Sequence, residues 1–212
     1  MSTATIESTL KPIWQTRRWT TAEFDALLAD GYLREGSKTF LWDGEIVEPM
    51  AENQPHIHAQ DNLLRILMRR LPEPEWTIYS AHPLALKEGY KPQPDLLVLV
   101  GPRSDYRSHV QTADDAALVI EVADSSYAAD AGDKLPEYAA AGIPQYWIVH
   151  LQARRIEAYS DPVVSSGVGR YADRKDYPLG EAVPLILARD GVTHEFGMIP
   201  VLDVLRDSLE EE

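Results

Sequence analysis

Two acidic residues lie in strongly apolar segments of the chain, and their placement predicts a cation site. Asp95 comes directly before the apolar run Leu96–Val100, and Glu121 lies near the end of a second apolar run at 116–123. If these segments form neighbouring antiparallel strands, both carboxylates fall at the same edge of a sheet. Two carboxylates in an apolar setting repel each other and are costly to ionise unless a cation lies between them. Because oxygen ligands with open positions suit Mg²⁺ or Mn²⁺, the pair predicts a divalent metal site.

A lysine further along the chain can complete such a site. Lys134 is the only lysine between Lys91 and Lys175, and it lies early in the helix expected after the Glu121 strand. A bound metal lowers the pKa of a water ligand and polarises a phosphoryl oxygen. Lys134 would orient or deprotonate the attacking water, or balance charge on the phosphate. The structural alternative is that Lys134 pairs with Asp130 at i,i+4 on a hydrated helix face.

Other catalytic chemistries are largely excluded. The chain has no cysteine, which removes disulfides, thiolate zinc sites and cysteine nucleophiles. It also lacks a phosphate-binding glycine loop, a nucleophile elbow, a His-Glu-x-x-His motif and a dinucleotide fingerprint. His56 and His58 form a His-x-His, but i,i+2 side chains diverge on a helix, so we expect one of them as an outer contact or phosphate contact. A hydrolase that uses both histidines on a small substrate remains an alternative.

Composition and charge limit the partners. The 212 residues are 44% hydrophobic and carry a formal net charge of −14, which excludes nonspecific coating of nucleic acid and predicts weak, strongly salt-sensitive DNA binding. No apolar leader or membrane span is evident, so we expect a cytoplasmic protein. The expected organisation is an extended N-terminal segment at 1–18, a single domain at 19–209 and an acidic tail at 210–212.

The elements that must position the site follow from the sequence pattern. Thr20 and Glu23 have the spacing of a capping box, and Asp43-Gly44 tolerates the positive φ of a two-residue hairpin turn. Hydrophobic periodicity and breakers define the other elements. The predicted order is a helix at 21–30, a hairpin at 40–48, a helix at 56–71, strands at 76–79, 83–86, 95–100 and 116–123, a helix at 128–141, strands at 145–151 and 154–159, loops with short strands at 161–191, and a helix at 201–209.

Several of these segments resemble the Uma family of restriction endonucleases, within the PD-(D/E)XK or restriction-endonuclease-like superfamily. The resemblance covers about residues 20–160, and its most specific part runs from Glu121 to Val149. It implies an α/β fold with a mixed central sheet flanked by helices, preceded by an N-terminal helix and a β-hairpin, in a bacterial protein. The matching segments are 42–48, 93–98, 118–126, 133–135 and 138–149.

The resemblance also implies site residues. The metal-binding aspartate and glutamate of the family fall on Asp95 and Glu121. The lysine of the superfamily falls on position 123, which is Ala123 here, although a side chain there would face the same side as position 121. In members of the family, the lysine looks as though it has moved to the following helix. That position falls on Lys134 in this sequence. The three catalytic residues implied are therefore Asp95, Glu121 and Lys134.

Supporting positions and partners complete the expectations. Superfamily members often add an acidic residue from an early element, for which Glu45 and Glu48 are candidates. Their alternation sends them to opposite faces, so at most one joins the site; His58 is a further supporting candidate. Related enzymes often work as dimers, and an exposed strand or an apolar face at 146–159 is a candidate surface for a homodimer.

The sequence therefore leads to two functional hypotheses. The first is a Mg²⁺- or Mn²⁺-dependent endonuclease that hydrolyses DNA phosphodiester bonds. The second is a catalytically silent, nuclease-like domain that binds nucleic acid or a protein partner, which the absence of a lysine at position 123 and the acidic composition favour.

Overall fold

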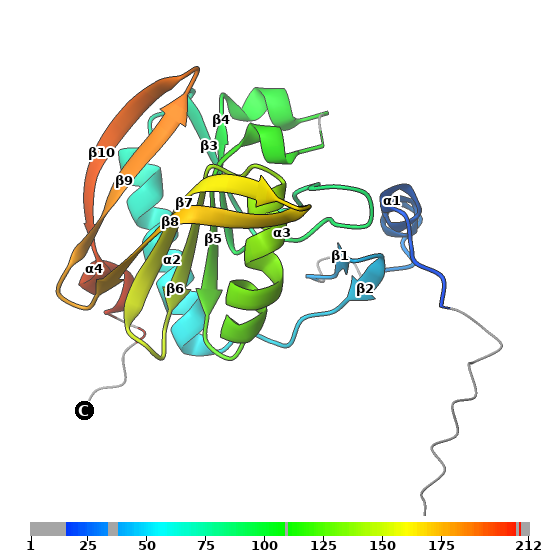
Figure 1. Ribbon diagram of the computed structural model, residues 1–212, viewed down its shortest axis with the longest axis horizontal. Helices are drawn as coiled ribbons and strands as arrows, with labels where there is room; N and C mark the ends of the chain where they lie inside the picture. Colours follow the sequence, from blue (N-terminus) through cyan, green and yellow to red (C-terminus); the bar gives the residue numbers. More distant parts are fainter. Residues whose placement is uncertain (1–15, 34–37, 109, 207, 209–212) are drawn as a thin grey trace, which may run out of the picture.

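A six-stranded mixed sheet forms the centre of the computed structural model, which describes residues 16–33, 38–108, 110–206 and 208. The strand order is β3-β4-β5-β6-β7-β8, and every neighbouring pair is antiparallel except β5 and β6 (Figure 1). No helix in the described ranges has the length and apolarity needed to cross a membrane. The elements are α1 (Thr21–Ala29), β1 (Phe40–Trp42), β2 (Glu45–Val47), α2 (Gln54–Arg70), β3 (Trp76–Ser80), β4 (Leu96–Val100), η1 (Arg103–Tyr106), η2 (Ala113–Asp115), β5 (Ala116–Ala123), η3 (Ala129–Lys134), α3 (Leu135–Ala140), β6 (Gln145–His150), β7 (Arg155–Ser165), β8 (Val168–Pro178), β9 (Ala182–Arg189), β10 (Val192–Pro200) and α4 (Val201–Leu205).

Local sequence signals set the N-terminal elements. The capping box is formed, because the Thr20 side chain accepts from the Glu23 N–H and the Glu23 carboxylate accepts from the Thr20 N–H. β1 and β2 pair across Asp43-Gly44, whose φ angles are 47° and 68°. Such positive values at both turn positions are those of a type I′ hairpin turn. The predicted helix and hairpin are therefore confirmed.

The predicted convergence of the two acidic strands is also confirmed. β4 and β5 are antiparallel neighbours, with Leu96 opposite Ile120. Asp95 precedes the first paired residue of β4, and Glu121 follows Ile120, so both lie at one edge of the sheet. The chain then crosses through η3 and α3 before it returns in β6, parallel to β5.

Different helices cover the two faces of the sheet. On one face, Ile120 and Val122 pack in a buried cluster with α2, α4 and the β9–β10 hairpin. On the other face, Val119 and Ala123 pack with Tyr138 of α3. Because side chains alternate along a strand, Glu121 lies on the α3 face. Burial on both faces explains why β4 and β5 are apolar apart from Glu121.

The helix predicted at 128–141 forms in two parts. Residues 129–134 make a π-helical turn, and α3 continues from Leu135. Pro136 has no N–H to donate to the Gly132 carbonyl, so a regular α-helical bond is missing at this point. Single π turns of this kind interrupt helices at functional sites, and this one carries Lys134.

Three expectations about strands and surfaces are wrong. Residues 83–86 form only an isolated bridge at Ala85 instead of a strand. The region at 161–191, predicted as loops with short strands, instead contains long strands: most of the β7–β8 hairpin and all of β9. The apolar face at 146–159 is internal, because Tyr146 and Tyr159 are buried with α3 and β8. It is therefore not a free dimer surface.

The predicted segments at 1–15 and 210–212 lie outside the described residues, and 16–18 form no regular element.

The contact between β8 and α3 predicts a strong stability effect. A Cβ added at Gly169 would lie 2.2 Å from both the Ala140 nitrogen and the Pro136 oxygen, and backbone atoms cannot rotate away. We expect Gly169→Ala to lower the free energy of unfolding by about 3 kcal/mol. Gly132→Ala is the control, since a Cβ there meets nothing within 4 Å. Urea unfolding compares the two; equal stabilities would contradict the packing of β8 against α3.

A fully buried carboxylate on β7 predicts an acid-dependent loss of stability. Glu157 accepts from Tyr159 Oη at 2.7 Å and from Arg155 Nη2 at 2.6 Å. Burial raises its pKa, but Tyr159, Arg155 and His150 outweigh burial and hold the pKa below its ordinary value. We expect Glu157→Gln to cost about 2 kcal/mol at pH 7.

Because the folded pKa is lowered, this cost should persist above the ordinary value of 4.5 and disappear as the pH falls through the folded pKa. Urea unfolding at several pH values, with the exposed Glu195→Gln as control, measures it. A difference from wild type that grows on acidification would contradict the assignment.

Candidate metal centre and catalytic cleft

A cleft of about 400 Å³ opens where β4, β5, the start of α2 and η3 meet. The two carboxylates and the lysine predicted from the sequence all line it. Five carboxyl groups and two ammonium groups occur among its described lining residues, so acidic groups outnumber basic ones in the cleft. These charged residues are Lys38, Glu52, Asp95, Glu121, Asp124, Asp130 and Lys134.

Asp95 is held firmly at the base of the cleft. Its Oδ2 accepts from the Val122 N–H at 2.7 Å, which fixes the carboxylate against β5. Its backbone carbonyl accepts from Gln60 of α2 at 2.8 Å. Burial raises the pKa of Asp95, but contact with His56 and the Val122 N–H together hold it below the ordinary value. Asp95 is therefore a preorganised carboxylate anion.

Glu121 and Lys134 form the second half of the site. Lys134 Nζ lies 3.1 Å from Glu121 Oε1 and 2.8 Å from Asp130 Oδ1. Tyr138 donates to the same Glu121 Oε1 at 2.8 Å. Lys134 reaches the sheet edge as predicted. The alternative pairing with Asp130 also forms, but it lies inside the protein instead of on a hydrated helix face. Asp130 is 1% exposed and the Lys134 side chain is 17% exposed.

The charges in this half of the site are strongly coupled. Burial raises the pKa of Glu121 to about 8, although Lys134 acts in the opposite direction. Burial lowers the pKa of Lys134, but Glu121 and Asp130 outweigh it, so the pKa lies well above its ordinary value. An ammonium held between two carboxylates remains protonated, so Lys134 is suited to donate hydrogen bonds or balance negative charge.

A third acidic group, missed by the sequence analysis, approaches Asp95 from the start of α2. His56 Nε2 lies 3.3 Å from Glu52 Oε1 and 3.3 Å from Asp95 Oδ1. Glu52, His56 and Asp95 can offer one ligand atom each within 4.8 Å of one another. Asn53 begins α2 by accepting from the His56 N–H at 3.0 Å, and it donates to Asp124 at 2.5 Å. The cap therefore ties this ligand group to the end of β5.

The donor set fits a divalent cation. The His56 side chain is buried, yet its Nε2 forms no well-aligned hydrogen bond with any described residue. An unpaired buried polar atom is unfavourable and calls for an explanation. Carboxylate oxygens suit Mg²⁺ and Mn²⁺, and an imidazole nitrogen suits transition metals. Asp95, with Glu121 on one side and Glu52 and His56 on the other, can hold such an ion.

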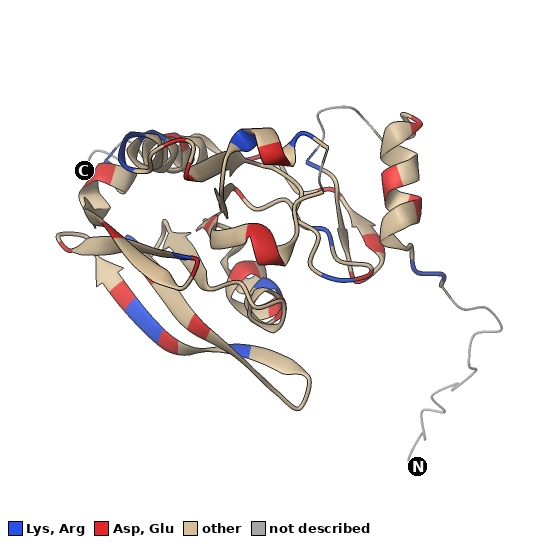
Figure 2. Ribbon diagram, turned by 90° about the horizontal axis from the view of Figure 1, so that it is seen from above, with Lys and Arg blue, Asp and Glu red and all other residues tan. Residues whose placement is uncertain are grey.

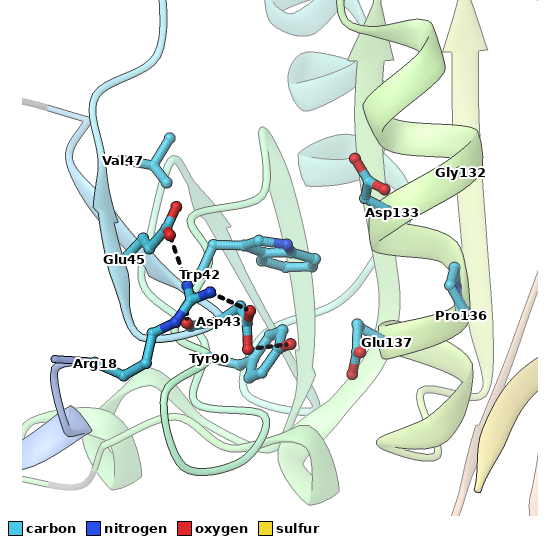
Figure 3. A pocket seen from close by; sticks show the side chains of 10 residues that line it. All are labelled: Arg18, Trp42, Asp43, Glu45, Val47, Tyr90, Gly132, Asp133, Pro136 and Glu137. Atoms are coloured by element: carbon cyan, nitrogen blue, oxygen red, sulfur yellow. Dashed lines mark hydrogen bonds and ion pairs between the residues drawn. The ribbon is translucent and has the colours of Figure 1, made fainter. Parts of the chain in front are cut away.

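The structure does not bring the predicted supporting residues into this cleft. His58 is exposed on α2 and Glu48 is exposed after β2, and neither lines the cleft. Glu45 lines a separate pocket of about 470 Å³ between the β1–β2 hairpin and α3. There its Oε1 lies 2.8 Å from Arg18 Nη1 (Figure 3). The acidic residue before β4 that does line the cleft is Glu52.

The sequence of the chain matches that of a known protein family. The family model Uma2, described as "Putative restriction endonuclease", matches residues 21–190. The chain belongs to the Uma2 family. The Uma2 match contains all the residues that line the cleft, and it confirms the family expected from the sequence. No curated protein matches the chain.

A solved structure supports the fold. The chain is similar to a crystal structure described as a putative nuclease belonging to DUF820 from Anabaena variabilis ATCC 29413, with a TM-score of 0.60 and 11% sequence identity. The alignment covers 81% of this chain and 91% of that chain. This confirms the predicted mixed α/β architecture. At 11% identity this likeness shows the fold, and the Uma2 family match is what points to a nuclease.

Proposed function

We propose that this Uma2 protein is a metal-dependent endonuclease that hydrolyses DNA phosphodiester bonds. The observation that carries the proposal is the convergence of Asp95, Glu121 and Lys134 in one cleft, with Lys134 Nζ 3.1 Å from Glu121 Oε1. In this proposal Asp95 and Glu121 hold Mg²⁺ or Mn²⁺. The ion, when bound, supplies Lewis-acid chemistry: it polarises the phosphate and lowers the pKa of water.

The protein's own residues supply orientation and charge. Glu121 and Asp130 hold the Lys134 ammonium in place from two sides. Lys134 can then donate a hydrogen bond to the attacking water or to a phosphate oxygen. Tyr138 donates to Glu121 and so limits the rotation of its carboxylate. This arrangement supplies, from the π turn, the ammonium that Ala123 cannot supply.

The surface charge predicts how DNA is bound. Figure 2 shows Lys and Arg interspersed with Asp and Glu along the described part of the ribbon. With a net charge of −14, the protein gains little from long-range attraction. The phosphate is therefore held mainly inside the cleft, where a bound cation neutralises the carboxylates. We expect DNA affinity to be weak and to fall steeply with salt.

A cleavage assay tests the function. Supercoiled plasmid is incubated with the protein after chelation, and then with Mn²⁺ or Mg²⁺ added in excess. We expect nicked and linear plasmid only with added metal, and no product when chelator is restored. Cleavage that is indifferent to metal and chelator would contradict the proposal, and an RNA substrate of the same sequence tests the preference for DNA.

A catalytically silent domain is the second candidate. The observation that favours it is that Glu121 Oε1 and Asp95 Oδ2 are already satisfied by protein donors. Such a domain would bind nucleic acid or a protein partner without hydrolysis. Calorimetry separates the two candidates, because a silent domain of this kind should show no divalent binding that depends on Asp95.

A further inference from the structure

Three side-chain atoms near the start of α2 form a compact group around His56. They are Glu52 Oε1, His56 Nε2 and Asp95 Oδ1, and the nitrogen lies 3.3 Å from each oxygen. Glu52 comes from the loop before α2, His56 from its first turn, and Asp95 from the start of β4. The expected pair of Asp95 and Glu121 does not account for Glu52 or His56.

Two of the three spacings in this group match those of ligands on one ion. Two ligand atoms about 2.1 Å from a metal are about 3.0 Å apart at a right angle and about 3.4 Å apart at the tetrahedral angle. The two distances of 3.3 Å fall in this interval. The imidazole nitrogen faces two carboxylate oxygens and is therefore in position to share a cation with them.

An ion pair without a metal explains the geometry less well. Nε2 carries at most one hydrogen, which can point at one oxygen, and here it is well aligned with neither. The residue is only 9% exposed, so water contributes little to its solvation. Lys38 contacts Glu52 Oε1 from the more exposed side of the cleft. The Glu52 carboxylate therefore already faces one cationic group, the Lys38 ammonium.

We propose that Glu52 and His56 are metal ligands, which together with Asp95 form a His-carboxylate site that selects Mn²⁺ over Mg²⁺. This inference deepens the proposed function and depends on it only for the presence of a divalent cation. Mg²⁺ prefers oxygen ligands and retains its waters, whereas an imidazole nitrogen suits first-row transition metals. The ligand set therefore determines which ion occupies the cleft.

Metal binding, measured apart from activity, tests the proposal. Isothermal calorimetry with Mn²⁺ and with Mg²⁺ is performed on the full chain and on His56→Gln, Glu52→Gln and His58→Gln. His58 is the matched control, because it lies two residues along the same helix and is exposed. We expect His56→Gln and Glu52→Gln to weaken Mn²⁺ binding at least tenfold and His58→Gln to leave it unchanged. His56→Gln should also reduce the preference for Mn²⁺ over Mg²⁺.

A spectroscopic measurement on the unmodified protein does not depend on any variant folding. Electron spin echo modulation of bound Mn²⁺ should show coupling to a directly bound nitrogen, which His58→Gln retains and His56→Gln loses. Absence of nitrogen coupling in wild type would overturn the proposal even if plasmid cleavage is normal. Nitrogen coupling from His56 without any plasmid cleavage would support this site and contradict the proposed nuclease function. Wild-type protein that binds no Mn²⁺ would overturn both.

Discussion

Asp95→Asn should reduce metal-dependent DNA cleavage about a thousandfold while leaving the protein folded. Asp95 is the carboxylate shared by both halves of the proposed site, since it faces His56 and also lies at the sheet edge beside Glu121. A catalytic metal stabilises the transition state by several kcal/mol, and about 4 kcal/mol corresponds to about a thousandfold in rate. An asparagine oxygen can still accept from the Val122 N–H, so the strand contact is retained. Plasmid nicking at saturating Mn²⁺ measures the effect.

A matched control separates charge in the cleft from charge elsewhere. Asp61 is an exposed aspartate on α2 that pairs with Arg65, and its replacement by asparagine should leave cleavage unchanged. Circular dichroism should show the same helix content for wild type and both variants. Unchanged cleavage by Asp95→Asn, with its fold intact, would remove Asp95 from the site.

Lys134→Met should have the largest effect on stability among the site residues. The ammonium lies between Glu121, which is 3% exposed, and Asp130, which is 1% exposed. Its removal leaves two buried carboxylates without their cation, and breaking a buried pair from one side is strongly destabilising. Because Glu121 can take up a proton, we expect the lower end of that range, about 3 kcal/mol at pH 7. Cleavage should also fall, since the donor to water or phosphate is lost.

An exposed ion pair supplies the comparison. Lys87 pairs with Glu137 of α3 and its side chain is 50% exposed, so Lys87→Met should cost less than about 1 kcal/mol. Adding Asp130→Asn to Lys134→Met should recover part of the lost stability, because one of the two uncompensated charges is removed. Urea unfolding measures all four proteins. Equal small losses for Lys134→Met and Lys87→Met would contradict the burial of the Lys134 cluster.

The central strands and the convergence of Asp95 with Glu121 could be predicted from the sequence. Both strands are apolar on both faces apart from Glu121. Their antiparallel pairing alone brings the start of β4 and the end of β5 to the same edge of the sheet. The place of Lys134 early in the helix after the Glu121 strand also predicted its approach to the sheet edge, and the family resemblance added its catalytic role. Its contact with Glu121 depends on a π turn, and sequence periodicity does not distinguish a π turn from an α turn.

Other features depend on tertiary contacts that have no local signal. Glu52 lies in a loop without periodicity, and its place is set by the Asn53 cap and its tether to Asp124, which is distant in the sequence. The sequence predicts the first half of β7 as a strand at 154–159, but the Gly, Ser, Pro and Asp content that follows predicts loops with short strands instead of the long hairpin. Tertiary packing overrides that preference. Gly169 lies against the backbone of α3, and Tyr171 is buried in one cluster with Tyr138, Tyr146 and Tyr159.

The central claim is that a divalent cation binds beside Asp95. It is tested most directly by anomalous diffraction from crystals soaked in Mn²⁺. The site proposed here predicts one strong peak in the cleft, about 2.2 Å from Asp95 Oδ1 and within bonding distance of His56 Nε2. Fully soaked crystals that show no anomalous peak at Asp95, or that bind Mn²⁺ only on the outer surface, would contradict it.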